Sequence, residues 1–138
     1  MTILLDTNII MDALQERSPF DIAAKKILMR GQSDDVTCMF TANAATDIFY
    51  LYSKASNIQS AQTALDFLLN TYKVVSVTHE DCLAARLLPI DDFEDALVVA
   101  CASKAGADYI ITRDEGFLRA DSPVQIISPN DFIIQLKG

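Results

Sequence analysis

The sequence predicts an α/β fold in which one sheet of parallel strands carries helices on both faces. Short apolar runs of strand length alternate with helical patterns from one end of the chain to the other. Strands connected through helices pair in parallel, and both faces of the sheet are then covered. The 138 residues suit one domain, residues 1–138, because domains commonly have about 100–200 residues.

Several segments have the short, buried and β-rich composition of strands. They are Thr2–Leu5, Val36–Phe40, Lys73–Val77, Asp108–Thr112 and Val124–Ile127. The predicted helices cover 7–14, 18–30, 41–53, 61–69, 78–89 and 91–106, with a short helical turn after Thr112 and a last helix from Ser128. The functional sites of such sheets lie at the carboxyl ends of the strands.

Residues typical of helix ends support these boundaries. Ser18 is expected to cap the helix over 18–30, and Gly31 to end it. Thr78 and Asp81 have the spacing that opens a helix, and Gly106 is expected to end the helix over 91–106.

Composition and charge exclude several classes of protein. No apolar run approaches the roughly 18–20 residues that span a bilayer, and the N-terminus lacks the basic region of a secretory signal, so we expect a cytoplasmic protein. Three scattered cysteines and a single His79 provide neither a disulfide framework nor zinc-ligand spacing. The formal net charge of −8 should repel a phosphate backbone, which is a first objection to nucleic-acid binding.

Acidic residues directly follow two of the predicted strands. Asp6 comes after Thr2–Leu5, and Asp114 comes just after Asp108–Thr112. Each could be a helix N-cap, a position that Asp favours. Each also lies at the end of a strand, where α/β sheets hold their functional sites.

More acids crowd the start of the helix predicted over 91–106, namely Asp91, Asp92, Glu94 and Asp95. One or two acids suffice to stabilise the positive end of a helix. With Asp91 as N-cap, Glu94 completes a capping box and Asp95 is left over. Asp95 precedes an apolar stripe, so it should lie at the edge of the buried face, where a cation would remove the cost of an unpaired carboxylate.

Asp47 lies in the middle of the helix predicted over 41–53, between Ala44 and Ile48 and one turn from Leu51. Asp is a poor residue inside a helix, and no Lys or Arg lies three or four residues away to pair with it. A solvent-facing boundary position is the alternative to a functional role.

Together, Asp6, Asp47, Asp95 and Asp114 are candidates for one metal site. Carboxylates gathered in one place cannot all ionise unless positive charge is supplied. Mg²⁺ or Mn²⁺ suits a site of oxygen ligands. Such an ion activates water, orients a phosphate and stabilises a leaving oxygen, which is the chemistry of phosphodiester hydrolysis.

Four segments spread along nearly the whole chain support this interpretation: LLDTNIIMDAL, TANAATDIFYLY, DDFEDALVVACASKAGADYIITRDEGF and VQIISPNDFI, in that order. This ordered set resembles the PIN domain family, and within it the small bacterial toxins of the VapC type. The resemblance implies a three-layer α/β/α sandwich with a mainly parallel central sheet of about five strands. It also implies an endoribonuclease that depends on Mg²⁺ or Mn²⁺ and leaves a 3′-hydroxyl and a 5′-phosphate.

Under this resemblance the metal ligands are Asp6, Asp95 and Asp114, and Asp47 completes the catalytic set. The family usually has Glu at the position of Asp47, and the shorter side chain here would reach the ion through water. The chain is also compressed after Asp114, which leaves Glu115 as a rival ligand.

Other side chains have supporting roles in this prediction. The accessory residues are Asp92, Glu115, Thr7, Asn8 and Thr112, which supply further carboxylates or hydrogen bonds to the ligands. The candidate phosphate contacts are the cations Arg17, Arg113, Lys25 and Arg119. The alternative for each cation is a solvated surface charge.

The similarity to toxins also implies partners. These are an RNA substrate, a second copy of the chain in a homodimer, and a cognate antitoxin whose C-terminal segment covers the acidic site with an Arg. The apolar helices over 41–69 are the expected docking surface. At least four of the 19 acids then belong to one cluster that metal would neutralise, so we expect RNA binding to require the metal.

Two other functions stay open at this point. A non-catalytic PIN-like interaction module would keep the fold without turnover, and the Asp47 substitution keeps this alternative in view. A Mg²⁺-dependent aspartyl phosphotransfer domain also places Asp at strand ends. Phosphatases of that kind have a second acid two residues after the first, where this chain has Asn8.

Overall fold

The computed structural model describes residues 1–137 and contains a five-stranded sheet. The strands are β1 (Thr2–Leu5), β2 (Thr37–Thr41), β3 (Lys73–Val75), β4 (Tyr109–Ile111) and β5 (Gln125–Ile127). Every neighbouring pair is parallel, in the order β3-β2-β1-β4-β5. The α/β class and the parallel sheet predicted from the sequence are therefore confirmed.

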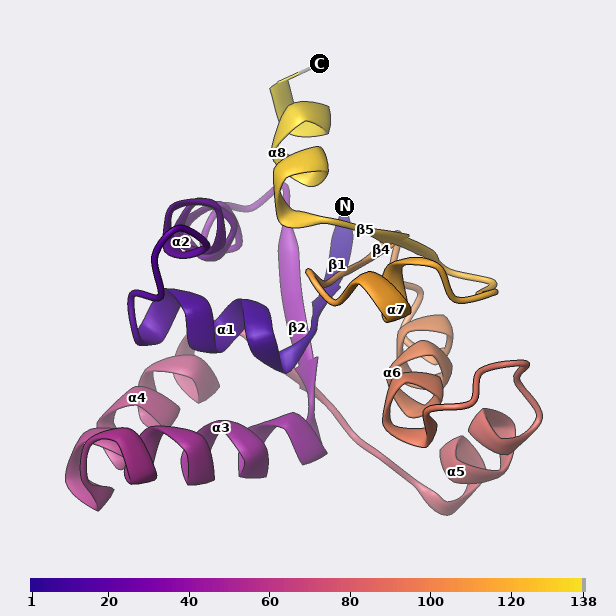
Figure 1. Ribbon diagram of the computed structural model, residues 1–138, viewed down its shortest axis with the longest axis horizontal. Coiled ribbons are helices and arrows are strands. Elements are labelled where there is room, and N and C mark those ends of the chain that lie inside the picture. Colours follow the sequence, from indigo (N-terminus) through magenta and orange to yellow (C-terminus); the bar gives the residue numbers. More distant parts are fainter. Residues whose placement is uncertain (138) are drawn as a thin grey trace.

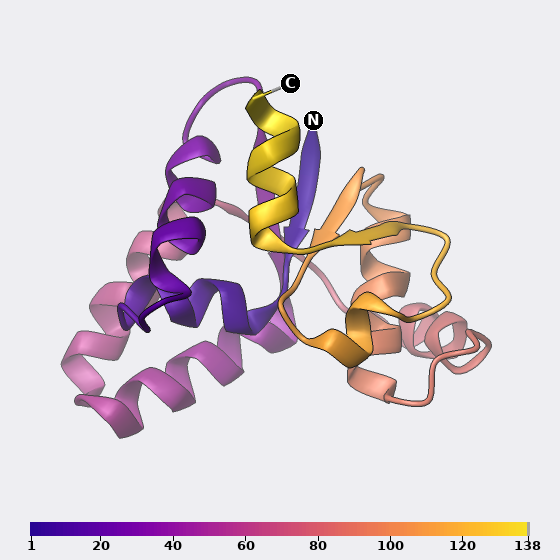
Figure 2. The ribbon, with the colours of Figure 1, turned by 45° about the horizontal axis from the view of Figure 1, so that its top comes forward.

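Helices cover both faces of the sheet, as Figures 1 and 2 show. They are α1 (Thr7–Leu14), α2 (Asp21–Arg30), α3 (Ala42–Ala55), α4 (Ile58–Thr71), α5 (His79–Arg86), α6 (Phe93–Lys104), α7 (Glu115–Leu118) and α8 (Pro129–Lys137). Helices α1–α4 and α8 pack on one face, and α5–α7 lie on the other. The predicted three layers are thus present.

The strands send alternate side chains into two apolar cores. In β1, Ile3 and Leu5 enter the core beneath α1, α2 and α3, whereas Leu4 enters the core beneath α6. Because both faces of the strand are buried, the segment appears in the sequence as a continuous apolar run rather than as an alternating pattern.

Helix ends agree with most of the predicted boundaries. Thr78 and Asp81 form a full capping box at α5, in which each side chain accepts from the backbone N–H of the other. Gly106 follows α6 with a φ of 71°, a conformation that glycine adopts without strain. Both predictions are confirmed.

The predicted cap at Ser18 is wrong. Helix α2 begins at Asp21, and its N-cap is Phe20, which makes no side-chain capping bond within the described chain. The carbonyl oxygen of Arg17 instead accepts from the backbone N–H groups of Phe20 and Asp21, at 2.8 and 3.0 Å. The backbone therefore closes the first turn, and the Ser18 hydroxyl is not needed there.

Gly31 does end α2, but for a different reason from the predicted one. Its φ of −67° is available to any residue. A Cβ on Gly31 would lie 2.3 Å from Sγ of Cys38, so close packing of α2 against β2 requires glycine here. Burial raises the pKa of that Cys38 thiol to about 12, as expected for a small apolar core side chain.

From Met1 to Lys137, no helix is both long and apolar enough to cross a membrane.

Candidate active site

Asp6 follows β1 and caps α1, which places it at the carboxyl edge of the sheet. Its Oδ1 accepts from the Thr7 backbone N–H at 2.8 Å. Its Oδ2 accepts from the Thr112 hydroxyl at 2.8 Å and from the Asn8 side-chain amide at 3.3 Å. Capping occupies one oxygen, and the remaining bonds fix the orientation of the carboxylate.

Thr112 connects the ends of β1 and β4. The two strands are neighbours, with Leu5 opposite Ile111, so the residues that follow them lie side by side. The fully buried Thr112 donates its hydroxyl hydrogen to Asp6 and accepts from the Asp114 backbone N–H at 3.1 Å. One buried hydroxyl thus bonds to Asp6 and to the backbone of Asp114, two acids that are far apart in the sequence.

The start of α6 differs from the predicted capping. Asp92 is the N-cap, and its Oδ1 accepts from the Asp95 backbone N–H at 3.1 Å. The predicted N-cap at Asp91 is therefore wrong, and so is its capping box with Glu94, because the helix starts only at Phe93. Glu94 and Asp95 consequently lie in the first turn of α6.

These segments surround a pocket of about 290 Å³, called the acidic pocket below. Its lining residues are Asp6, Thr7, Asn8, Met11, Arg17, Leu51, Asp92, Glu94, Asp95 and Asp114. The structure therefore brings together Asp6, Asp95 and Asp114, the three residues that the sequence analysis proposed as metal ligands. It also brings Asp92, Thr7, Asn8 and Arg17 to the same pocket.

Asp95 has the largest pKa change among these acids. Burial raises the pKa of Asp95 to about 7, and the negative charges of Asp92, Asp6, Asp114 and Glu94 contribute to the rise. Carboxylates that raise one another's pKa lie within each other's electric field. The acidic pocket is therefore a site that favours added positive charge.

The pKa of Asp6 is raised by some of its surroundings and lowered by others. Burial raises its pKa, while the hydrogen bonds from Thr112 and Thr7 act to lower it. The charges of Asp114 and Asp92 add smaller increases. The net pKa is raised, so the hydrogen bonds orient the Asp6 carboxylate without fully compensating for its burial and its acidic neighbours.

Glu94 is a member of the acidic pocket that the sequence does not mark as a site residue. Burial raises the pKa of Glu94, and the charges of Asp47, Asp6 and Asp92 raise it further. The crowded acids at the start of α6 indicated this residue, since capping employs fewer acids than the segment holds. A helix start at Asp91, as the sequence predicts, would make Glu94 the partner of Asp91 in a capping box and so hide its place in the pocket.

Asp47 lies half-buried on α3, beside the acidic pocket rather than in its lining. Leu51, one turn further along α3, does line the pocket. The charge of Asp47 contributes to the raised pKa of Glu94, so the two carboxylates interact electrostatically. The structure thus brings Asp47 near the cluster without placing its carboxylate in the pocket wall.

The two candidate ligands after β4 are separated by the fold. Asp114 lines the acidic pocket and caps α7 by accepting from the Gly116 backbone N–H at 2.9 Å. Glu115 lines a different pocket, together with Phe20 and Arg113. This geometry favours Asp114 over its rival.

Arg113 takes part in an ion pair with a buried acid. Its Nε and Nη2 donate to the two carboxylate oxygens of Asp12 at 2.6 and 3.0 Å, and Asp12 is only 1% exposed. Arg17 lies 3.8 Å from the same carboxylate. The sequence alone does not reveal this buried role of Asp12, because a single Asp on an otherwise apolar helix resembles a surface acid.

The remaining proposed cations lie in different surroundings. Arg17 lines the acidic pocket, and its guanidinium donates to the Gln15 side chain at 2.7 and 3.1 Å. Arg119 lines an adjoining hollow of about 600 Å³ that shares Asp92, Asp95 and Asp114 with the acidic pocket. Lys25 pairs with Glu16 at 2.9 Å on the surface.

The donors of the acidic pocket match a hard divalent cation in chemistry. They are carboxylate, hydroxyl and amide oxygens, which Mg²⁺ and Mn²⁺ prefer. The Asn8 Oδ1 atom is buried and has no hydrogen-bond partner among the described residues, so a further oxygen is available there. Across residues 1–137 no three His, Cys, Asp or Glu side chains are gathered closely enough to hold an ion as they stand. Ionised carboxylates repel one another and so stay apart, and a bound cation offsets this repulsion.

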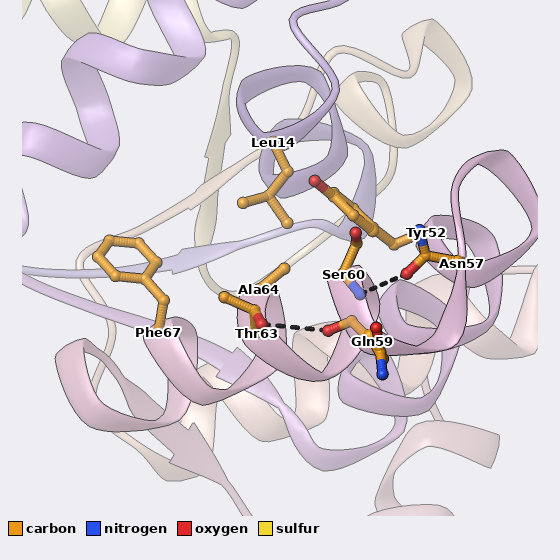
Figure 3. Close-up of a pocket in the computed structure, with 8 residues that line it drawn as sticks. All are labelled: Leu14, Tyr52, Asn57, Gln59, Ser60, Thr63, Ala64 and Phe67. Carbon is orange, nitrogen blue, oxygen red and sulfur yellow. Dashed lines mark hydrogen bonds between the residues drawn. The ribbon is translucent and has the colours of Figure 1, made fainter.

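A hollow of different character lies between the end of α1 and the α3–α4 pair (Figure 3). It has a volume of about 490 Å³ and is lined by Leu14, Tyr52, Asn57, Gln59, Ser60, Thr63, Ala64 and Phe67. Figure 3 shows the Leu14 and Tyr52 side chains close together above α4. The lining carries apolar and uncharged polar side chains, in contrast to the acidic pocket.

The parallel sheet in this order, with acids after β1, after β4 and at the start of α6, defines a PIN-like α/β protein. Residues 2–116 match the PIN domain family, and the chain belongs to this family. No curated protein matches the chain.

Solved structures with the same fold include components of toxin–antitoxin complexes. A chain of VapBC2 from Rickettsia felis, bound to a DNA fragment from its promoter, superposes with a TM-score of 0.69 at 18% identity, over 93% of this chain and 98% of that one. VapC20 of Mycobacterium tuberculosis, a toxin that cleaves the sarcin–ricin loop, gives 0.68 at 20% identity, over 83% and 92%. A toxin–antitoxin complex from Klebsiella pneumoniae gives 0.69 at 18% identity, over 92% and 97%.

Proposed function

We propose that this PIN domain protein is a Mg²⁺- or Mn²⁺-dependent endoribonuclease and the toxin of a toxin–antitoxin pair. The observation that carries the proposal is the convergence of Asp6, Asp95 and Asp114 on one pocket at the carboxyl edge of the sheet. The raised pKa values of Asp6 and Asp95 support a demand for positive charge at that point. The likeness to VapC structures supports the choice of RNA as the substrate.

Asp6, Asp95 and Asp114 are the proposed metal ligands. A bound divalent ion would supply positive charge for water activation and for the leaving oxygen. Thr112 and Thr7 hold the Asp6 carboxylate in one orientation through hydrogen bonds. Such supporting bonds commonly determine how well a carboxylate performs as a ligand.

Glu94 and Asp47 extend the carboxylate cluster in this proposal. Glu94 lines the acidic pocket, and its pKa is raised by the charges of both Asp47 and Asp6. Asp47 has one methylene fewer than the usual family Glu, and it lies outside the pocket wall. We assign Glu94 as the carboxylate that completes the set formed by Asp6, Asp95 and Asp114, and Asp47 as an acid that acts through water.

The proposed reaction is hydrolysis of one phosphodiester bond. A water molecule attacks the scissile phosphorus in line with the leaving 3′-oxygen, and the bond from phosphorus to that oxygen breaks. The products are a 3′-hydroxyl and a 5′-phosphate. Arg17 in the pocket and Arg119 in the adjoining hollow are the proposed phosphate contacts, on either side of the shared acids.

The proposed protein partners are an antitoxin and a second copy of the chain. An antitoxin Arg placed among the carboxylates would neutralise the acidic pocket much as a cation does. Leu51 lines the acidic pocket and Tyr52 lines the hollow of Figure 3, so α3 touches both surfaces. Ile48 was also expected on that docking surface, but it is 1% exposed and belongs to the core.

Cleavage of single-stranded RNA by the purified chain tests the function. We expect activity with Mn²⁺ or Mg²⁺, none in EDTA, and a loss of at least about 100-fold in Asp6→Asn and Asp95→Asn, which keep shape and remove charge. Asp66→Asn, an exposed acid on α4, is the matched control and should retain activity. Full activity in Asp6→Asn or Asp95→Asn would refute the proposed metal core.

A non-catalytic interaction module is the second candidate, favoured by the Asp47 substitution and by the open arrangement of the acids. Calorimetry with Mn²⁺ separates the two. The nuclease proposal requires binding that Asp95→Asn weakens and Asp66→Asn does not. A chain that binds no Mn²⁺ would favour the module.

A further inference from the structure

A second pocket lies next to the acidic one and has a mixed aromatic and cationic lining. It has a volume of about 330 Å³, within the range of roughly 300–1,000 Å³ typical of ligand sites. The lining includes Phe20, Ala23, Arg113, Glu115, Leu118 and Pro129. We call it the aromatic pocket.

Phe20 is an unusual residue for its position. It is the N-cap of α2, where Ser, Thr, Asp or Asn would bond to the helix, and its side chain makes no such bond among the described residues. Its side chain is 44% exposed, so burial does not account for the choice either. The ring is therefore fixed neither by capping nor by the core, and it packs against the Arg113 guanidinium instead.

Arg113 presents a flat group that is already fixed in place. Asp12, almost completely buried, accepts from two of its guanidinium nitrogens, and the guanidinium carbon lies 4.0 Å from the centre of the Phe20 ring. The guanidinium therefore loses little further freedom when a ligand binds beside it. Flat aromatic and guanidinium surfaces are the groups on which unpaired nucleic-acid bases stack.

The aromatic pocket and the acidic pocket are adjacent along the chain. Asp114 lines the acidic pocket, and the next residue, Glu115, lines the aromatic one. Consecutive Cα atoms are about 3.8 Å apart, so the walls of the two pockets meet at the Asp114–Glu115 peptide. In the proposed function, the lining of the aromatic pocket therefore shares a wall with the point of cleavage.

We propose that the aromatic pocket binds an unpaired base of the RNA next to the cleaved phosphate. This inference rests on the proposed function, because it uses the acidic pocket as the point of cleavage. Stacking does not depend on net charge, so it supplies affinity that a chain of net charge −8 lacks in basic surface. Glu115 also lines the aromatic pocket, and a carboxylate is an acceptor for an exocyclic amino group of a base.

The test uses nucleoside 5′-monophosphates, which contain no phosphodiester bond to cleave, and ribose 5-phosphate as the base-free control. Binding to the full chain in Mg²⁺ is followed by NMR titration. We expect the monophosphates to bind about tenfold more tightly than ribose 5-phosphate, and to shift the Arg113 Nε–H resonance. Phe20→Leu should abolish the difference, and Phe20→Trp should retain it.

Phe67→Leu is the matched control, because Phe67 is 45% exposed and lies on α4 in the hollow of Figure 3. It should leave the preference for a base unchanged. Equal binding of ribose 5-phosphate and the monophosphates, or an unaltered preference in Phe20→Leu, would overturn the inference even if RNA is cleaved. A preference that depends on Phe20 would support it even if RNA is not cleaved, so the two proposals fail separately.

Discussion

The Thr112 hydroxyl donates to Oδ2 of Asp6 at 2.8 Å across the ends of β1 and β4, and the two residues are 106 positions apart in the sequence. Thr112 is fully buried, so its hydroxyl has little choice of partners. The hydroxyl oxygen of Thr112 also accepts from the Asp114 backbone N–H. The bond from Thr112 to Asp6 therefore makes the orientation of a proposed metal ligand depend on the register of the parallel sheet.

Thr112→Val should remove that bond while keeping the side-chain shape. Because the hydrogen bond from Thr112 lowers the pKa of Asp6, its loss should raise that pKa further and loosen the carboxylate. We expect affinity for Mn²⁺ to fall about 10-fold or more, and the free energy of unfolding to fall by about 1 kcal/mol. Thr112→Ser keeps the hydroxyl and should bind Mn²⁺ nearly as the original does. Equal affinities in all three proteins would show that the bond has no part in metal binding.

The raised pKa of Asp95 predicts an unusual dependence of stability on pH. A carboxyl group whose pKa is raised from 3.8 to about 7 on folding holds its proton more tightly in the folded chain. Its contribution to stability is therefore complete below pH 3.8 and is lost as the pH rises through about 7. Asp95→Asn removes this loss, so in EDTA it should melt at a higher temperature than the original protein at pH 8.

The melting difference between these two proteins should shrink as the pH falls toward 4, because Asp95 then approaches neutrality in both the folded and the unfolded chain. Thermal melts in EDTA from pH 4 to pH 8 provide the measurement. A difference that stays constant over this range would contradict the raised pKa of Asp95.

Much of this arrangement could be predicted from the sequence, and the reason is physical. Strands buried on both faces consist of continuous apolar runs, so Asp6 and Asp114 could be placed at strand ends from composition alone. Parallel pairing then gathers those ends at one edge. The sequence indicates Asp95 for two reasons. It lies beside an apolar stripe, and it is one acid more than capping of the helix requires.

The errors have an equally specific origin. The α6 cap was assigned to Asp91 because two adjacent Asp residues have the same preference, and only the backbone decides between them. The partnership of Arg113 with Asp12 spans 101 positions of sequence and leaves no local pattern. Gly31 does end α2 as predicted, but the reason for glycine there is contact with Cys38 on another element, which leaves no local pattern.

The buried Asp12 predicts a large loss of stability on substitution. Its carboxylate is 1% exposed and accepts two hydrogen bonds from Arg113. Asp12→Ala leaves the arginine without its partner, and the free energy of unfolding should fall by about 3 kcal/mol in urea denaturation. Asp35→Ala, which breaks the exposed pair with Arg30, should change the free energy of unfolding far less. Similar costs for both substitutions would contradict the assigned role of Asp12.

Substitution of the two helix-ending glycines by alanine should destabilise the protein for two different reasons. Gly31→Ala puts a Cβ 2.3 Å from Cys38 Sγ, and overpacking of this kind costs about 1–3 kcal/mol. Gly106→Ala meets no atom within 4 Å in the described chain, but its φ of 71° costs about 1 kcal/mol. Cys38→Ala should therefore rescue Gly31→Ala in part and leave Gly106→Ala unaffected. Additive effects of Gly31→Ala and Cys38→Ala would refute the packing explanation.

The most direct test of the central claim is diffraction from crystals soaked in Mn²⁺, with the ion located by its anomalous signal. We expect a peak in the acidic pocket, with carboxylate oxygens of Asp6, Asp95 and Asp114 at about 2.0–2.3 Å and Glu94 closer than Asp47. Crystals of Asp95→Asn should lose the peak or show it much weakened. Well-ordered Mn²⁺ elsewhere with none in the acidic pocket would contradict the account.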